Sequence, residues 1–145
     1  MNKKRLIIAG AALVVLIIVG VMVGMLLKVR AEIARVKAVA LTEHDISKLP
    51  DDELLGTEIF MGTEFQVAVR VAGGRIVQAR VMKDDGRAYV KKARVILDAV
   101  VAAQAVKGID AVSGATVSSK VLLNATQNAL EGAAAEKSAP AADAP

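Results

Sequence analysis

The sequence contains no cysteine and a single histidine, His44. Without cysteine the chain cannot form disulfides, bind an iron–sulfur cluster through thiolates or attach a c-type haem. One histidine does not support a histidine-based metal site, and it is more simply a surface residue. No nucleophile is paired with a recognisable base, so hydrolysis is not indicated. Any redox chemistry must therefore come from a bound organic cofactor.

Aromatic residues are also scarce, because the chain has only Phe60, Phe65 and Tyr89. Three aromatic side chains do not support base stacking. The formal net charge is +4, but five of the 19 basic residues flank an apolar run near the N-terminus. The remaining 14 basic residues stand against 15 acidic ones, so the rest of the chain is near neutral. Without a basic patch, nucleic acid is not an expected partner.

The apolar run covers residues 6–27 and contains no charged residue. At about 1.5 Å per residue, a helix of this length spans the core of a lipid bilayer. The only Ala-x-Ala pattern nearby, Ala38-Val39-Ala40, lies too far downstream for cleavage as a signal peptide. We therefore expect residues 1–30 to form an uncleaved, single-pass anchor in a bacterial-type cytoplasmic membrane.

The side of the membrane follows from the basic residues next to the anchor. Lys3, Lys4 and Arg5 precede the apolar run and favour a cytoplasmic N-terminus. The remainder of the chain would then be extracytoplasmic. Basic residues also follow the run, beginning with Lys28 and Arg30, and they weaken this preference.

Beyond the anchor, residues 31–48 have a helix-compatible composition and are expected to form a juxtamembrane stalk, which ends before Pro50. Residues 65–71 and 75–82 alternate between apolar and polar side chains, as strands do. Gly73-Gly74 lies between them and predicts a hairpin turn. A further strand is expected near residues 58–61.

Two helices follow in the predicted order of elements. The first covers residues 88–106 and ends at Lys107-Gly108, where glycine suits a helix C-terminus. The second begins near residue 116 and ends at about Gly132. The predicted fold is α+β, a small antiparallel sheet with two helices packed on it, preceded by the transmembrane helix. The alanine- and proline-rich residues 133–145 are predicted to be a disordered tail.

Four hydroxyl side chains and one glycine are gathered in a segment that reads Asp110-Ala111-Val112-Ser113-Gly114-Ala115-Thr116-Val117-Ser118-Ser119-Lys120. Small hydroxylated residues directly before an apolar helical pattern mark a helix N-terminus. Free N–H groups and the positive end of the helix dipole make such a terminus suitable for an anion such as phosphate. Gly114 would let a ligand approach the backbone closely. A capped helix without any ligand is the alternative that the pattern leaves open.

The motif Asp-x-x-Ser-Gly-Ala-Thr-x-Ser within this segment resembles that of the FMN-binding domain family. This family includes the covalent-flavin subunits of sodium-translocating NADH:quinone reductase and of the Rnf complex. The resemblance covers about Leu49 to Leu130 and extends to Gly86-Arg87, Lys91-Lys92-Ala93 and Gln104. It implies an FMN-binding domain over residues 49–132.

The resemblance also implies the site residues. In members with covalent flavin, a separate FAD:protein FMN transferase joins the FMN phosphate to the last hydroxyl residue of the motif. Here that residue is Ser118, where threonine is usual, and serine offers the same hydroxyl group. The implied cofactor-binding residues are Asp110, Ser113, Gly114, Ala115, Thr116 and Ser118. Thr116 can equally be a helix cap, and Asp110 can equally fix the loop or cap the helix.

Several residues outside the motif have two interpretations each. A group of basic side chains can neutralise phosphate or steer a redox partner, or simply form a solvated helix face. These residues are Arg87, Lys91, Lys92 and Lys120. Tyr89 can stack on the flavin ring or belong to the core.

The function implied is that of a membrane-anchored flavoprotein that transfers electrons to an unidentified redox partner, not that of a self-contained catalyst. Two alternatives remain. The chain is either a binding or structural module of this fold without covalent flavin, or an accessory subunit of a membrane redox ion pump.

Overall fold

The computed structural model describes residues 2–138, which separate into one compact unit ending at Arg35 and a second beginning at Val36. The first unit lies within helix α1 (Lys3–Ala38), whose large apolar side chains are exposed along residues 6–27. By length and composition α1 can cross a membrane. The expected anchor and much of the expected stalk therefore form one continuous helix.

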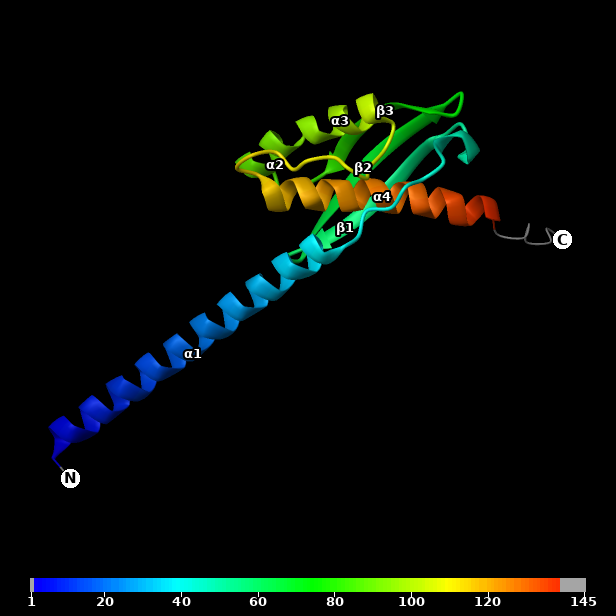
Figure 1. Ribbon diagram of the computed structural model, residues 1–145. Helices are drawn as coiled ribbons and strands as arrows, with labels where there is room; N and C mark the ends of the chain where they lie inside the picture. The colour runs from blue at the N-terminus through cyan, green and yellow to red at the C-terminus, as the bar shows by residue number, and fades with distance from the viewer. Residues whose placement is uncertain (1, 139–145) are drawn as a thin grey trace. The chain divides into compact units, whose positions relative to one another are not determined.

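The second unit is a three-stranded antiparallel sheet with helices on one face (Figure 1). Its elements are the short 3₁₀ helix η1 (Ile46–Lys48), β1 (Glu53–Phe60), β2 (Thr63–Ala72), β3 (Arg75–Lys83), α2 (Ala88–Ala93), α3 (Val95–Ala103) and α4 (Thr116–Ser138). The strand order is β1-β2-β3. Helix α4 covers β1 and β2, and α3 covers β3. The predicted α+β fold is confirmed.

Strand β1 is longer than the sequence pattern indicates. It begins at Glu53, and its buried residues are Leu54, Gly56 and Glu58, which alternate with exposed ones. A glycine and a glutamate in the buried positions hide this alternation from a hydropathy pattern. The tight turn from β1 to β2 has positive φ at both Met61 and Gly62, which suits the twist of a hairpin.

The predicted hairpin of β2 and β3 is confirmed, and both glycines of its Gly73-Gly74 turn have positive φ. Two irregularities in the pairing change which side chains of β3 face the core. Val71 pairs with Ile76 but Arg70 pairs with Gln78, so Val77 has no partner and is exposed. A β-bulge of this kind inserts one residue and shifts the alternation. Ile76 is therefore buried, although strict alternation along β3 would place Ile76 and Val81 on different faces of the sheet.

The helix predicted over residues 88–106 is divided in two at Arg94, and it ends at Ala103 instead of at Gly108. Gln104 ends it in the left-handed conformation, with φ of 54°. The Gln104 side chain accepts a hydrogen bond from the Ile76 amide at 2.8 Å and donates to the Ile76 carbonyl at 2.8 Å and the Val101 carbonyl at 2.6 Å. The bond to the Val101 carbonyl caps α3 where a glycine cap was expected, and the two bonds to Ile76 tie the end of the helix to β3.

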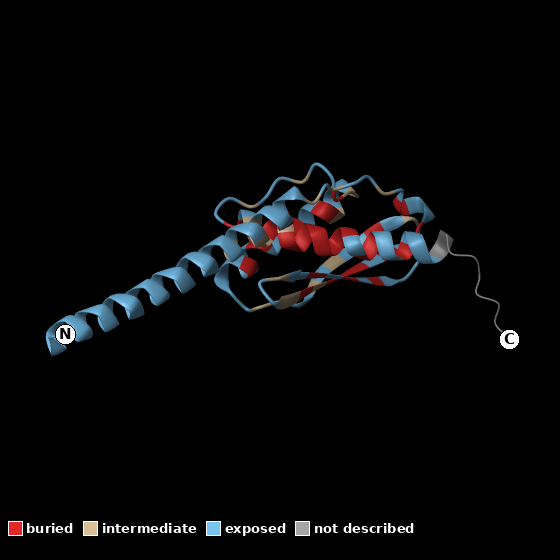
Figure 2. Ribbon diagram, turned by 90° about the horizontal axis from the view of Figure 1, so that it is seen from below, coloured by how far each residue is buried: buried red, intermediate tan, exposed pale blue. Residues whose placement is uncertain are grey.

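The core lies between the sheet and the helices, and Figure 2 shows the buried stretch along the middle of α4. Leu97 of α3 and Leu122 of α4 are both buried, as their positions in the apolar patterns predict. Helix α4 extends beyond Gly132 to Ser138, and residues 139–145 of the predicted tail lie outside the described residues.

The closest packing in the second unit is between β1 and α4 at Gly56. A Cβ atom at this position would lie 1.9 Å from the Ala125 carbonyl oxygen and 2.4 Å from the Ala129 amide nitrogen. Backbone atoms of a packed helix cannot yield as a flexible side chain can. The separation of strand and helix therefore depends on residue 56 having no side chain.

We expect Gly56→Ala to lower the free energy of unfolding by about 3 kcal/mol or more, because the helix must move away from the sheet. The thermal midpoint of the full chain in detergent should fall by more than about 10 °C. Gly132→Ala is the control, since a Cβ there meets no atom within 4 Å and alanine favours a helix. Equal midpoints for the two variants would contradict the packing described.

Candidate functional site

The hydroxyl-rich segment forms a turn that leads directly into α4. The Ala115 amide donates to the Val112 carbonyl at 2.9 Å. Gly114, the third residue of this turn, has φ of 76°, the value that a type II turn requires at that position. The sequence expectation of a glycine-containing loop before a helix N-terminus is thus met in the backbone.

Helix α4 begins with unpaired amides. Its first bond runs from the Ser119 amide to the Ala115 carbonyl at 2.9 Å. The amides of Thr116, Val117 and Ser118 precede this bond and have no acceptor within the helix. Three amides at the positive end of a helix of 23 residues are suited to bind an anion.

The two adjacent serines occupy different environments. Ser119 is fully buried, and its Oγ accepts a hydrogen bond from the Val112 amide at 3.0 Å. Ser118 is half-buried, and its hydroxyl has no hydrogen bond to any residue in the described range. Ser119 therefore closes the loop against the helix, while the hydroxyl of Ser118 is left for another partner.

The other motif residues line the same turn. Ala115 is buried, whereas Asp110, Ser113 and Thr116 are exposed. Neither the Asp110 carboxylate nor the Thr116 hydroxyl makes a hydrogen bond within residues 2–138, so neither forms the cap that was considered for it. The hydroxyl that holds the loop is that of Ser119, through its bond from the Val112 amide, and the sequence analysis did not assign Ser119 this role. Its spacing of three, four and seven residues from Leu122, Leu123 and Thr126 would have placed it on the buried face of the helix.

Of the four basic candidates, Lys92 reaches the turn. A Cβ atom at Gly114 would lie 2.8 Å from the Lys92 Nζ, so the ammonium group occupies the space where a side chain at residue 114 would begin. Helix α2, which carries Lys92, packs against α4. The contact between Lys92 and Gly114 depends on this packing, and no local sequence pattern predicts it.

The ends of α2 are held by two acidic residues. Arg94 Nη2 contacts Asp84 Oδ2 at 2.6 Å, and Arg87 Nε contacts Asp85 Oδ2 at 3.3 Å. Burial raises the pKa of the Asp84 carboxyl, but hydrogen bonds from Arg94 and from the Gly86 amide outweigh burial and hold this pKa below its ordinary value. Arg87 thus pairs with a carboxylate at the surface.

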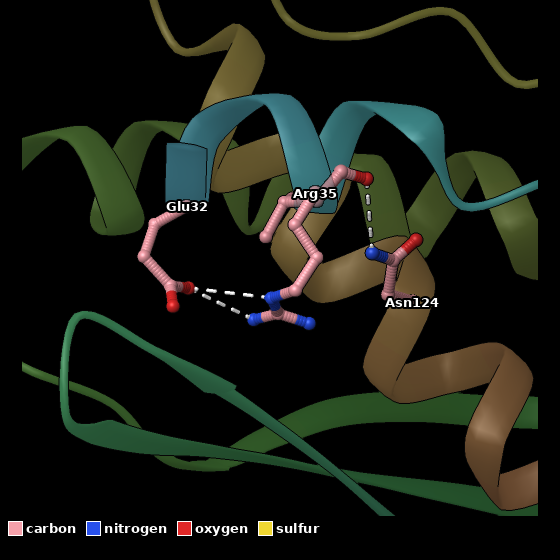
Figure 3. A network of polar contacts seen from close by, with 4 residues as sticks. Glu32, Arg35 and Asn124 are labelled. Atoms are coloured by element: carbon pink, nitrogen blue, oxygen red, sulfur yellow. Dashed lines mark hydrogen bonds and ion pairs between the residues drawn. The ribbon is translucent and has the colours of Figure 1, made fainter. Parts of the chain in front are cut away.

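Lys120 turns to a different neighbour. Its Nζ donates to the Val39 carbonyl at 3.5 Å. Nearby, Asn124 Nδ2 donates to the Val36 carbonyl at 3.2 Å, a bond that Figure 3 shows. Gln127 adds two bonds, from its Nε2 to the Ala40 carbonyl and from the Thr42 amide to its Oε1. One face of α4 therefore holds the extended segment 39–42, and Lys120 belongs to this contact.

Tyr89 is 65% exposed, so the interpretation of Tyr89 as a core residue is wrong. It lies in the first turn of α2, where the polypeptide has just left the Asp84–Arg87 loop. Of the two interpretations of Tyr89, stacking on the flavin ring is the one that agrees with its exposure.

Comparison with known families finds a match over part of the chain. Residues 61–131 match the FMN-binding domain family, and the matched range includes the turn, the start of α4 and Lys92. No match was found among curated proteins or among solved structures.

Replacing Ser119 by alanine should destabilise the loop, because the partly buried Val112 amide loses its acceptor. We expect a loss of about 1–3 kcal/mol in the free energy of unfolding and faster hydrogen exchange at the Val112 amide. Ser118→Ala, the matched control, should change stability by less than about 0.5 kcal/mol. Melting of both variants in detergent measures the difference, and a larger loss for Ser118→Ala would reverse the assignment.

Proposed function

Because this chain belongs to the FMN-binding domain family through residues 61–131, we propose that it is a membrane-anchored flavoprotein that carries FMN on Ser118 and transfers electrons outside the cytoplasm. FMN is the cofactor indicated by the family. When bound, it supplies reversible oxidation and reduction, and the protein holds it and sets its environment.

One observation carries the proposal, namely the state of the Ser118 hydroxyl. The hydroxyl lies at the start of α4, next to three amides that have no hydrogen-bond acceptor within the helix. It makes no hydrogen bond within the described residues. These amides and the side-chain-free Gly114 fit a phosphate group. A hydroxyl at such a position is suited to carry a phosphoester.

Covalent attachment would proceed by exchange at phosphorus with FAD as the donor. A bond forms between Ser118 Oγ and the FMN phosphorus, the bond from that phosphorus to the AMP oxygen breaks, and AMP leaves. The Oγ proton passes to a base. Serine is weakly nucleophilic without activation, and no residue within hydrogen-bonding distance of Ser118 Oγ in residues 2–138 activates it. This supports a separate FAD:protein FMN transferase as the partner that supplies the base.

Location outside the cytoplasm is the second part of the proposal. Helix α1 provides a membrane span, and the basic residues before it favour a cytoplasmic N-terminus. The redox partner would then be a membrane or extracytoplasmic protein.

We expect Ser118→Ala to abolish flavin fluorescence that survives denaturation, when the chain is co-expressed with the transferase. Ser118→Thr should retain it, because threonine keeps the hydroxyl group. Ser119→Ala should also retain it despite its lower stability. Gel fluorescence and intact mass measure the attached FMN. Flavin that washes out of the unaltered protein on denaturation would show that binding is not covalent, and a chain without flavin would favour a cofactor-free module.

The absence of cysteine allows the membrane side to be tested with one introduced thiol. Asp98→Cys, on the exposed surface of α3, should react with a membrane-impermeant maleimide in intact cells. Asn2→Cys, before the span, should react only after the membrane is opened. The reverse pattern would place the flavin domain in the cytoplasm.

A further inference from the structure

We infer that the Lys92 ammonium binds the phosphate of FMN and so distinguishes FMN from flavins without phosphate. This inference rests on the proposed function, in that it takes the turn before α4 as the place of the flavin phosphate. It adds a residue outside the motif, on a different helix, and gives it a specificity role.

The first argument is the position of the ammonium group. Nζ of Lys92 lies 2.8 Å from the position that a Cβ of residue 114 would take, over the turn that precedes the free amides of α4. A phosphate that accepts hydrogen bonds from these amides would stand next to a positive charge. A hydrogen bond between a charged donor and a charged acceptor is about twice as strong as one between neutral groups, so a bond from Lys92 would add to those from the amides.

The second argument is charge balance along α2. Four basic residues lie between residues 87 and 94, and the two arginines among them are paired with Asp85 and Asp84. Lys91 and Lys92 have no ion pair within the part of the chain that the structure describes. The Lys92 ammonium group lies near the first amides of α4 and has no carboxylate as counter-ion within the described residues. A ligand with a phosphate dianion would supply the missing negative charge.

The third argument is the way that α2 is fixed. Val90 and Ala93 are buried, and the Arg94–Asp84 pair holds the end of the helix. The backbone of Lys92 is therefore held in place, and only its flexible side chain needs to adjust to a ligand. Gly114 completes the arrangement, because any side chain at residue 114 would compete with the ammonium group for the same space. The glycine thus has two uses, its positive φ and the room that it leaves for Lys92.

The test compares FMN with riboflavin, which is the same flavin without the phosphate. The background is full-length Ser118→Ala protein in detergent, which cannot form the phosphoester, so that quenching of flavin fluorescence is used to measure reversible binding and its dissociation constant. Lys92→Gln in this background should weaken FMN binding by about tenfold and leave riboflavin binding within about twofold. Lys92→Arg should retain most of the preference for FMN, because it keeps the charge.

Lys91→Gln is the matched control, since it removes the same charge one residue away on the same helix. It should change FMN affinity by less than about twofold at 0.15 M salt, where exposed charges are screened. If the background protein binds flavin too weakly to measure, the initial rate of FMN attachment in the Ser118 protein replaces the dissociation constant. The same order of variants is expected there.

Three results would overturn the inference: unchanged FMN binding in Lys92→Gln, an equal loss for FMN and riboflavin, or an equal loss in Lys91→Gln. The second would mean that Lys92 only supports the fold, and the third that general charge attracts the ligand. Failure of the proposed function gives a different pattern, in which the unaltered protein takes up no flavin from FAD and the transferase and binds none of the free flavins.

Discussion

The contact on which the second unit depends is that between Gly56 and the backbone of α4. It brings a strand and a helix so close that their main chains touch, with Ala125 and Ala129 as the small residues on the helix side. Asn128 reinforces the contact through a hydrogen bond of 2.7 Å from its Nδ2 to the Thr57 carbonyl. Because a helix is rigid along its axis, a contact near residues 125–129 also determines where residues 116–118 lie. The geometry of the turn before α4 is thus set partly by a glycine in a distant strand.

Three different sets of groups on α4 have three different roles. Its apolar residues cover the sheet, its first amides make no bond within the helix, and Lys120, Asn124 and Gln127 hold residues 36–42. These sets lie at different angles around the helix, which 3.6 residues per turn permits. Ser118 and Ser119 show the separation most clearly, because adjacent residues point about 100° apart. The Ser118 hydroxyl is half-buried and makes no hydrogen bond within residues 2–138, whereas the Ser119 hydroxyl is buried in the loop contact.

Much of this arrangement follows from patterns in the sequence, and the exceptions have common causes. The Gly73-Gly74 hairpin, the span and the start of α4 depend on local signals, namely glycine pairs, charge-free length and small hydroxyl residues. The bulge at Val77, the break at Arg94 and the helix end at Gln104 depend on partners far away in the chain. Local propensity places the helix end at Gly108, but the bonds between Gln104 and Ile76 end it earlier.

The candidate site also contains residues that local sequence signals indicate and residues that only contacts between distant parts of the chain bring together. The motif indicates Ser118 and Gly114 from sequence alone, whereas the approach of Lys92 requires α2 to pack on α4. The exposure of Tyr89 is also a tertiary effect, because helical spacing alone places it with Ala93 and Ile96. Residues that interact within one turn can be assigned from sequence, and residues joined by helix packing cannot.

The Gln104 carboxamide has a consequence for the edge of the sheet. It accepts from the amide of Ile76 and donates to its carbonyl, as a residue of a neighbouring strand would. Strand β3 pairs with β2 on its other side, so these are the groups that point away from the sheet. An open strand edge is a template on which another chain can add. By occupying both groups, one glutamine side chain blocks strand addition at this part of β3, and it leaves no free backbone donor or acceptor at Ile76 for the edge of a second chain.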